Sequence, residues 1–409
     1  MVDIAVIGFG SYGWNLAEHV VEKGESVGCR LSAAADGRLA ELEERTGILR
    51  RAGVELFDDA AAMLDAVAER CDAVYVATGI DSHAPLTIAA AGRGLHVLVE
   101  KPPAATIQDL DEMLSALDGA GTMGQVGFQQ IHGEETRLLK QRVVEGALGT
   151  IRTVTCHACW PRTLKYFARN GWSGRLRNPA GEWVLDGPST NALAHQVNNM
   201  LYVASTKAGG YAAPTSVRAE LYAAGPIESH DTGAIEIRTE DGPTIYWFGT
   251  HCSREHFGPM IEVEGEKGRA NWRPGEEMQI DLEDGTEEAR RAANASPNMI
   301  ANFAEAVAAN DPRRLRCSLR ATRAFVLSVN GAHESSGRIH RIDSTFHRVA
   351  GTTPEEQTTV IDGIDELVVR AAGEKRLFSE LDGAPSWTRT TGPFDLRGYD
   401  RFPQRFVCD

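Results

Sequence analysis

A glycine-rich turn near the N-terminus constrains this chain more than any other sequence feature. Residues 5–13 read Ala-Val-Ile-Gly-Phe-Gly-Ser-Tyr-Gly, so an apolar strand pattern runs directly into the spacing G-x-G-x-x-G. Gly8 permits the sharp turn, Gly10 lets the backbone approach a pyrophosphate, and Gly13 lets the next helix pack closely on the strand. We expect that helix over residues 14–23.

The start of this helix also favours anion binding. Its first N–H groups have no partner within the helix, and they lie at the positive end of the helix dipole. The sequence therefore predicts a dinucleotide site in the turn, formed by Gly8, Phe9, Gly10, Ser11, Tyr12 and Gly13.

A carboxylate after the second apolar stretch indicates which dinucleotide binds. Asp36 follows residues 31–35, at roughly the twenty-residue separation where an acidic side chain accepts hydrogen bonds from the adenosine ribose. The same charge repels a 2′-phosphate, so NAD is the expected cofactor. Arg38 keeps NADP open as an alternative, because a guanidinium can bind that phosphate.

Composition limits the partners. The chain has 409 residues and a net charge of -15, which disfavours binding to nucleic acid and to anionic membranes. No apolar run approaches the ~20 residues that span a bilayer, and the N-terminus lacks the pattern of a signal peptide. The seven cysteines are odd in number and scattered, as is usual in a reducing compartment. We therefore expect a cytoplasmic protein.

The segment Cys156-His157-Ala158-Cys159 resembles a metal-binding motif only superficially. It lies in an alternating run, residues 153–160, that predicts a strand. Side chains three apart on a strand face opposite sides, and no second Cys/His pair follows at zinc spacing. We expect no metal.

Strands and helices alternate through the first third of the chain. Buried strands are expected at residues 73–77, 96–99 and 124–128, with helices over 85–93 and 107–117. Repeated βα units predict a doubly wound parallel sheet of the Rossmann type, with the ligand crevice at the carboxyl ends of its strands. Two segments fall at such ends, residues 78–83 and 100–103, and they supply Thr78, Gly79, His83, Glu100 and Lys101 as further cofactor-binding candidates.

These motifs together resemble the Gfo/Idh/MocA oxidoreductases. The similarity rests on the glycine turn, residues 78–83, and Glu100-Lys101-Pro102 after a Gly-x-His-Val-Leu-Val strand, and it continues through residues 145–151. The resemblance implies a C-terminal α+β domain with a large, mostly antiparallel open sheet. It also implies a homodimer or homotetramer, and a cis bond before Pro102.

The second half of the chain fits such a domain. Alternating runs at residues 217–222, 234–239, 244–249 and 261–265 predict strands, and helices are expected over 299–309 and 319–331. We place the dinucleotide-binding domain at 1–130 and the substrate-binding and oligomerisation domain at 131–345. We expect residues 346–409 to form an extension that packs on or caps the second domain, and the alternative is that it wraps a neighbouring subunit.

Lys101 is the expected centre of the chemistry. An ammonium at a strand end beside the nicotinamide can hydrogen-bond the reacting oxygen, stabilise a developing alkoxide and relay a proton. Glu100 would orient the cofactor or Lys101.

The stretch from Gly187 to Asn198 departs from the family pattern. Family members typically carry Asp four residues before and three residues after a catalytic His, on a helix whose i and i+4 positions share one face. This chain has Asn191 and Asn198 at those places around His195. An amide can position a hydroxyl or an imidazole but cannot accept a proton. His195 is therefore expected to bind substrate, either as an acid/base group or as a binding group only; a buried structural histidine is the alternative.

A basic segment precedes that helix. Residues 160–181 contain no Asp or Glu and interleave aromatic residues with basic ones, which are Arg162, Lys165, Arg169, Arg175 and Arg177. Guanidinium groups pair with carboxylate or phosphate. We expect Arg162, Arg169 and Trp172 to bind substrate and Tyr166 to assist catalysis. The alternative is a solvated loop or one that pairs with a neighbouring subunit.

The sequence thus predicts an NAD(P)-dependent oxidoreductase that transfers hydride between nicotinamide and a hydroxyl or carbonyl carbon of a sugar, cyclitol or sugar derivative. That carbohydrate-like substrate could be anionic. Two alternatives are a redox-assisted glycoside hydrolase or epimerase that holds NAD tightly, and a non-catalytic dinucleotide sensor.

Overall fold

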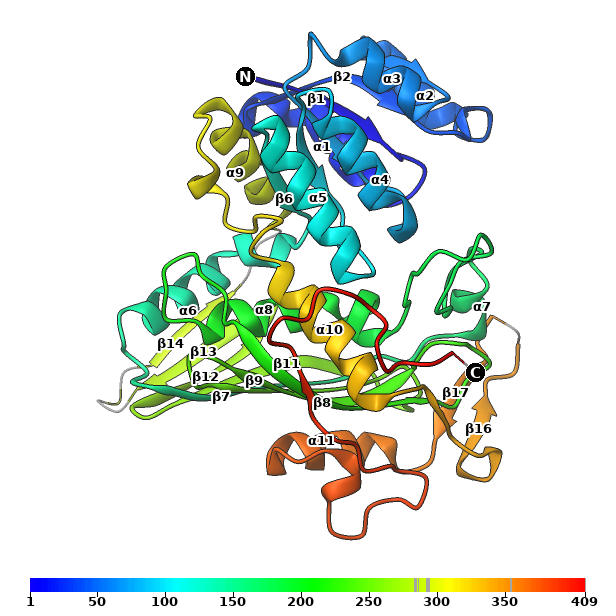
Figure 1. Ribbon diagram of the computed structural model, residues 1–409, viewed down its shortest axis with the longest axis vertical. Helices are drawn as coiled ribbons and strands as arrows, with labels where there is room; N and C mark the ends of the chain where they lie inside the picture. The colour runs from blue at the N-terminus through cyan, green and yellow to red at the C-terminus, as the bar shows by residue number, and fades with distance from the viewer. Residues whose placement is uncertain (283–284, 286, 292–294, 354, 409) are drawn as a thin grey trace. The chain divides into compact units, whose positions relative to one another are not determined.

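The computed structural model describes residues 1–282, 285, 287–291, 295–353 and 355–408 (Figure 1). The chain divides into two compact units, each described by itself. Unit 1 comprises Met1–Ala104, Gln108–Gly133 and Asn294–Arg323, and unit 2 comprises Ala105–Ile107, Glu134–Ala293 and Ala324–Asp409.

Unit 1 is built on a parallel sheet in the order β3-β2-β1-β4-β5-β6. Its strands are β1 (Val2–Ile7), β2 (Cys29–Ala35), β3 (Glu55–Phe57), β4 (Ala73–Val76), β5 (His96–Val99) and β6 (Gly124–Val126). The central strands are buried along their length because both sheet faces carry helices. The order reverses direction between β1 and β4, where dinucleotide sheets have their binding crevice. The predicted Rossmann sheet is confirmed.

The helices of unit 1 follow the predicted alternation. They are α1 (Gly13–Val27), α2 (Glu43–Arg51), α3 (Ala60–Val67), α4 (Ile80–Ala91), α5 (Ile107–Ala120) and α9 (Ser296–Ala308), with short 3₁₀ turns η1 (Leu39–Glu41), η2 (Gln129–His132) and η4 (Pro312–Arg314). Helix α9 packs against α1 through Ile300 and Phe303. Residues 294–323 therefore belong to unit 1 although they come late in the chain.

Unit 2 contains a large sheet in the order β14-β13-β12-β11-β7-β10-β9-β8-β15, with β18 also paired to β8. The pairs are antiparallel except β7–β10 and β8–β15. The strands are β7 (Ile151–Cys159), β8 (Pro214–Ala223), β9 (Thr232–Thr239), β10 (Thr244–Thr250), β11 (Phe257–Gly265), β12 (Gly268–Arg273), β13 (Glu277–Leu282), β14 (Glu287–Arg291), β15 (His340–Arg341) and β18 (Phe394–Asp395). This mostly antiparallel sheet confirms the second half of the fold prediction.

Helices cover both faces of that sheet (Figure 1). They are α6 (Glu134–Val144), α7 (Leu164–Phe167), α8 (Ala194–Ala204), α10 (Arg323–Ser336) and α11 (Ile364–Glu374), with one π-helical turn (Pro188–Ala192) before α8 and 3₁₀ turns η5 (Ser344–Phe346) and η6 (Phe378–Glu380). A small hairpin, β16 (His347–Ala350) with β17 (Thr358–Ile361), completes the unit. The helix expected over 319–331 begins later, at Arg323.

The C-terminal segment is tied into unit 2 at two places. Helix α11 packs on the sheet through Leu367 and Val368, against a cluster that includes Phe248. Further on, the buried carboxylate of Glu334 in α10 accepts hydrogen bonds from the Tyr399 hydroxyl at 2.7 Å and from the backbone N–H groups of 404, 405 and 406 at 2.6–2.8 Å. Among the described residues, no helix is long and apolar enough to cross a membrane.

Candidate active site

The glycine turn of unit 1 leaves no room for a side chain at Gly8 or at Gly13. A Cβ on Gly8, which has φ +86°, would lie 2.6 Å from the Ala77 carbonyl oxygen, and one on Gly13 would lie 2.0 Å from the Gly8 oxygen. Phe9 is buried, while Ser11 and Tyr12 are exposed. The turn therefore presents backbone at its surface, as pyrophosphate binding requires.

Asp36 lies at the end of β2 directly beside this turn. Its carboxylate accepts hydrogen bonds from the backbone N–H of Gly10 at 2.8 Å and from that of Arg38 at 3.0 Å. The Arg38 side chain lies 3.5 Å from the same carboxylate and is more than half exposed. The structure thus brings the cofactor-binding candidates Gly10, Asp36 and Arg38 together.

His83 connects the two loops that follow β4 and β5. The ring is buried, its Nδ1 donates to the Pro102 carbonyl oxygen at 2.8 Å, and its Nε2 lies 3.3 Å from the Thr78 oxygen. Burial lowers the pKa of His83, and the hydrogen bonds to the Pro102 and Thr78 carbonyl oxygens oppose that shift. Gly79 precedes α4, and Thr78 accepts a hydrogen bond from Ser82 at 2.6 Å. His83 therefore holds the position of both loops from within.

Glu100 and Lys101 follow β5. The Glu100 carboxylate is buried, accepts a hydrogen bond from the Tyr75 hydroxyl at 2.5 Å, and accepts another from the Lys101 backbone N–H at 3.1 Å. Burial raises the pKa of Glu100, and the Tyr75 hydroxyl and the Lys101 charge oppose that rise. The Lys101–Pro102 peptide bond is cis, as the resemblance implies.

In unit 2 the segment around His195 is not one continuous helix. Residues 188–192 form a π-helical turn, Leu193 has φ -112° and ψ 22°, and α8 begins at Ala194. The expectation that Asn191 and His195 share one face of a regular helix is therefore replaced by a junction between two helical segments. Asn191, His195 and Asn198 are all buried. Within the described residues, the only hydrogen bond of the Asn198 side chain is to the Tyr211 hydroxyl, at 3.4 Å.

A carboxylate that sequence reasoning missed lies beside Asn191. Asp186 is 4% exposed, and its Oδ1 accepts a hydrogen bond from Asn191 Nδ2 at 2.7 Å. Its Oδ2 accepts one from the Gly174 backbone N–H at 2.7 Å and lies 3.9 Å from Nη2 of Arg169. The only signal in the sequence is an isolated acid at the end of an apolar run, Trp183-Val184-Leu185.

The aromatic and basic candidates of residues 160–181 also form a cluster. The Arg169 guanidinium carbon lies 3.7 Å from the ring centroid of Tyr166 and 5.4 Å from that of Trp172. The Arg162 guanidinium lies 4.8 Å from the same Tyr166 ring. Burial raises the pKa of the Tyr166 hydroxyl, and the two arginines oppose that rise. Through Asp186, this cluster is connected to Asn191.

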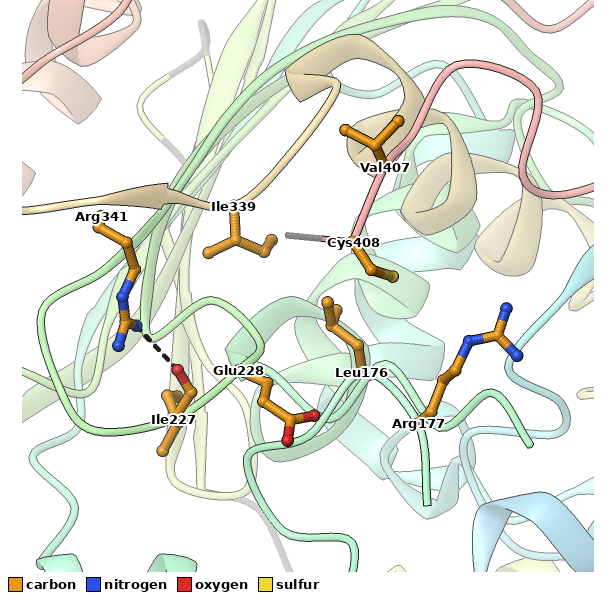
Figure 2. Close-up of a pocket in the computed structure, with 8 residues that line it drawn as sticks. All are labelled: Leu176, Arg177, Ile227, Glu228, Ile339, Arg341, Val407 and Cys408. Atoms are coloured by element: carbon orange, nitrogen blue, oxygen red, sulfur yellow. Dashed lines mark hydrogen bonds between the residues drawn. The ribbon is translucent and has the colours of Figure 1, made fainter. Parts of the chain in front are cut away.

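A cavity of about 330 Å³ lies elsewhere in unit 2 (Figure 2). Arg341 donates a hydrogen bond to the Ile227 carbonyl oxygen at its edge, at 2.8 Å. Its other lining residues are Leu176, Arg177, Glu228, Ile339, Val407 and Cys408. It contains none of the predicted site residues, so it is separate from the candidate active site.

Comparison with known proteins agrees with this fold. Residues 2–128 match the profile of the oxidoreductase family with an NAD-binding Rossmann fold, and residues 136–271 match the GFO/IDH/MocA C-terminal domain. The myo-inositol 2-dehydrogenase of Thermotoga maritima is 25% identical over 272 residues, which are 65% of this chain and 73% of that protein. The D-glucoside 3-dehydrogenase of Escherichia coli is 30% identical over 195 residues, 47% of this chain and 50% of that protein.

Solved structures share the fold. The WlbA dehydrogenase of Bordetella pertussis, in complex with NADH and UDP-GlcNAcA, superposes with a TM-score of 0.66 at 21% identity, covering 82% of this chain and 96% of that one.

The fold and the cofactor turn define an NAD(P)-dependent oxidoreductase with an NAD-binding Rossmann domain. The two profile matches together span more than half of the chain, which belongs to the GFO/IDH/MocA family.

Proposed function

We propose that this protein is a dehydrogenase that uses NAD to oxidise a secondary hydroxyl of a sugar, cyclitol or sugar derivative, or performs the reverse reduction. The single observation that carries the proposal is Lys101, which follows β5 at the carboxyl edge of the Rossmann sheet and is hydrogen-bonded through its backbone to the buried Glu100. That edge is where a nicotinamide ring is placed in sheets of this topology.

The residues of unit 1 fit NAD. The glycine turn exposes backbone where side chains have no room, and Asp36 stands beside Gly10 at the end of β2. Gly8, Gly10 and Gly13 would hold the pyrophosphate against the start of α1, and Asp36 would accept the ribose hydroxyls. When bound, NAD supplies the hydride acceptor at C4 of its nicotinamide.

The chain itself must supply the proton transfer. The Lys101 ammonium would donate a hydrogen bond to the reacting oxygen, stabilise its negative charge and pass on the hydroxyl proton. His195 and Tyr166 would bind neighbouring hydroxyl groups and assist that transfer.

Asp186 would act as a positioning residue for Asn191. An ionised carboxylate can only accept hydrogen bonds, so Asp186 fixes the nitrogen of Asn191 toward itself and the amide oxygen toward the opposite side. Asn191 would then offer an acceptor to a substrate hydroxyl.

The relatives support a polyhydroxylated substrate. Two of them are named for oxidising myo-inositol and a D-glucoside.

We further propose that the protein is a homo-oligomer, either a dimer or a tetramer, and that it is located in the cytoplasm. Light scattering of the purified protein tests the assembly.

The proposed activity is tested with a panel of sugars, cyclitols and uronates, each supplied with NAD or NADP, by following absorbance of the reduced nicotinamide. Steady accumulation of NADH with at least one substrate is expected. Product formation without net NADH would instead indicate a redox-assisted hydrolase or epimerase that recycles its cofactor. Cofactor binding without any turnover would favour a sensor.

A further inference from the structure

The basic segment of residues 160–181 divides into paired and unpaired cations. Arg169 lies 3.9 Å from Asp186, Arg175 lies 3.4 Å from Glu228, and Lys165 lies 3.8 Å from Glu355. Within the parts of the chain that the structure describes, Arg162 and Arg177 have no carboxylate within 4.0 Å. The segment is therefore neither a uniformly solvated loop nor fully neutralised.

Arg162 is the unpaired cation that lies in the aromatic and basic cluster around Tyr166. Its guanidinium carbon is 4.8 Å from the ring centroids of both Trp160 and Tyr166, and the residue is partly buried. Its Nε is covered by protein and has no hydrogen-bond acceptor among the described residues. Contact with two aromatic rings restricts the motion of the guanidinium, which reduces the entropy lost when an anion binds to it.

The neighbours of Arg162 do not cancel its charge. The buried His251 donates from Nδ1 to the Trp160 carbonyl oxygen at 2.8 Å. Burial, together with the nearby charge of Arg162, lowers the pKa of His251 to about 3, so that ring is neutral. Asp186 is shared with Arg169. The cluster of Arg162, Arg169 and Asp186 thus holds two positive charges against one negative charge.

We infer that Arg162 recognises an anionic group, a carboxylate or a phosphate, on the substrate of the proposed dehydrogenase. The inference rests on the proposed function, because it assigns the substrate to the same site. The substrate class is then a sugar acid or a phosphorylated sugar rather than a neutral polyol. Two N–H donors of the guanidinium would engage two oxygens of the anion.

The test compares matched ligands. Each charged ligand is compared with a neutral partner: D-glucuronate and D-glucose 6-phosphate with D-glucose, and galacturonate with galactose. Every ligand is titrated into the NAD-loaded protein by calorimetry. The kcat and KM for each ligand are measured alongside. The variants are Arg162→Gln, Arg162→Lys and Arg177→Gln. Arg177 is the matched control because it also lacks a carboxylate partner and also stacks on a tryptophan, 3.7 Å from the Trp183 centroid, but lines the cavity of Figure 2.

We expect the wild-type protein to bind at least one acid or phosphate at least about 10-fold more tightly than its neutral partner. Arg162→Gln removes that preference, Arg162→Lys retains part of it, and Arg177→Gln keeps it in full. The carboxylate and phosphate arms identify which anion is bound. Equal affinity for charged and neutral ligands, no binding of any charged ligand, or a preference that survives in Arg162→Gln overturns the inference.

The outcomes also separate this inference from the proposed function. If neutral sugars are oxidised with NAD and the charged ones have no advantage, the dehydrogenase assignment stands and the role of Arg162 fails. If charged sugars bind through Arg162 but NAD is never reduced, the anion site stands and the dehydrogenase assignment fails. Thermal melting of each variant shows whether lost binding reflects lost folding.

Discussion

The side-chain nitrogen of Asn191 donates a hydrogen bond to Oδ1 of Asp186 at 2.7 Å, so the buried acid in front of α8 determines how this amide is oriented. The same carboxylate also holds the Gly174 backbone and lies near Arg169. A carboxylate is thus present next to Asn191 after all, supplied by a residue five positions earlier in the chain.

Replacing Asp186 with Asn tests this arrangement. We expect kcat to fall by about 10- to 100-fold, the loss typical of removing a group that orients a ligand-binding one, while the NAD affinity is unchanged. The double variant Asp186→Asn/Asn191→Asp restores one carboxylate, now at position 191. It also restores the hydrogen bond between the two side chains, with position 186 donating and position 191 accepting. Partial recovery of kcat in the double variant and a pH profile that differs from that of Asp186→Asn support a positioning role. No recovery with identical pH profiles means that Asp186 only stabilises the fold.

Lys101→Ala tests the proposed catalyst. We expect kcat to fall by roughly 10² to 10⁴, because one group both stabilises the developing charge and transfers the proton. NAD affinity, measured by fluorescence titration, should change far less. Near-normal turnover in this variant would remove Lys101 from the mechanism.

Asp36→Ser tests cofactor choice. The carboxylate that repels a 2′-phosphate is removed, and Arg38 loses its ion pair at 3.5 Å and becomes available to that phosphate. The ratio of NAD to NADP affinity should fall by about 10- to 100-fold. In Asp36→Ser/Arg38→Ala the gain in NADP affinity should disappear while the loss of NAD affinity persists. A wild-type enzyme that already prefers NADP contradicts the assignment of Asp36.

His195→Asn separates binding from proton transfer. If His195 only binds substrate, KM should rise more than kcat falls, because a contact made equally in the ground and transition states is lost. If it is the acid/base group, kcat should fall steeply and the pH profile of kcat should lose one inflection. Retention of both kcat and KM would show that His195 is a structural residue.

The buried His333 predicts how stability depends on pH. It lies in α10, its Nδ1 donates to the Val329 carbonyl oxygen at 2.8 Å, and burial lowers its pKa to about 4. In the unfolded chain the imidazole of His333 binds a proton near pH 6.5. The contribution of His333 to the free energy of unfolding is therefore fully present above about pH 6.5. It is lost as pH falls toward 4, by up to roughly 3 kcal/mol.

The measurement is the free energy of unfolding between pH 7 and pH 4, with His333→Asn as the comparison, because the Asn amide can donate to the same carbonyl. The variant should show a shallower decline with falling pH. Equal slopes in the two proteins would mean that His333 does not contribute to the acid sensitivity.

Local patterns predicted much of unit 1. The glycine turn, Asp36 and the strand ends at residues 78–83 and 100–103 are encoded by short sequence spacings, and the parallel sheet brings such ends to one edge. His83 shows the limit of that reasoning. Its position at a strand end makes it a cofactor candidate, which stays a prediction. The contacts of its two ring nitrogens with the backbone oxygens of Thr78 and Pro102 could not be predicted from that position.

Unit 2 was harder to predict because its site depends on contacts between distant segments. Asp186 reaches Asn191 only because residues 187–193 form a π-helical turn and a break rather than a regular helix. The partners of Arg175 and Lys165 are Glu228 and Glu355, about 50 and 190 residues away. No spacing rule relates such positions, so the basic segment could be recognised from the sequence but not divided into paired and unpaired cations.

The convergence of four donors on Glu334 has a consequence for local unfolding. The Tyr399 hydroxyl and three successive N–H groups at 404–406 share one carboxylate. Losing any one of these bonds leaves the same buried carboxylate with one partner fewer, so we expect the segment to detach from α10 as a single cooperative step rather than by fraying residue by residue. Hydrogen exchange at these three amides should accordingly proceed at one common opening rate, and that rate reports the integrity of α10 itself.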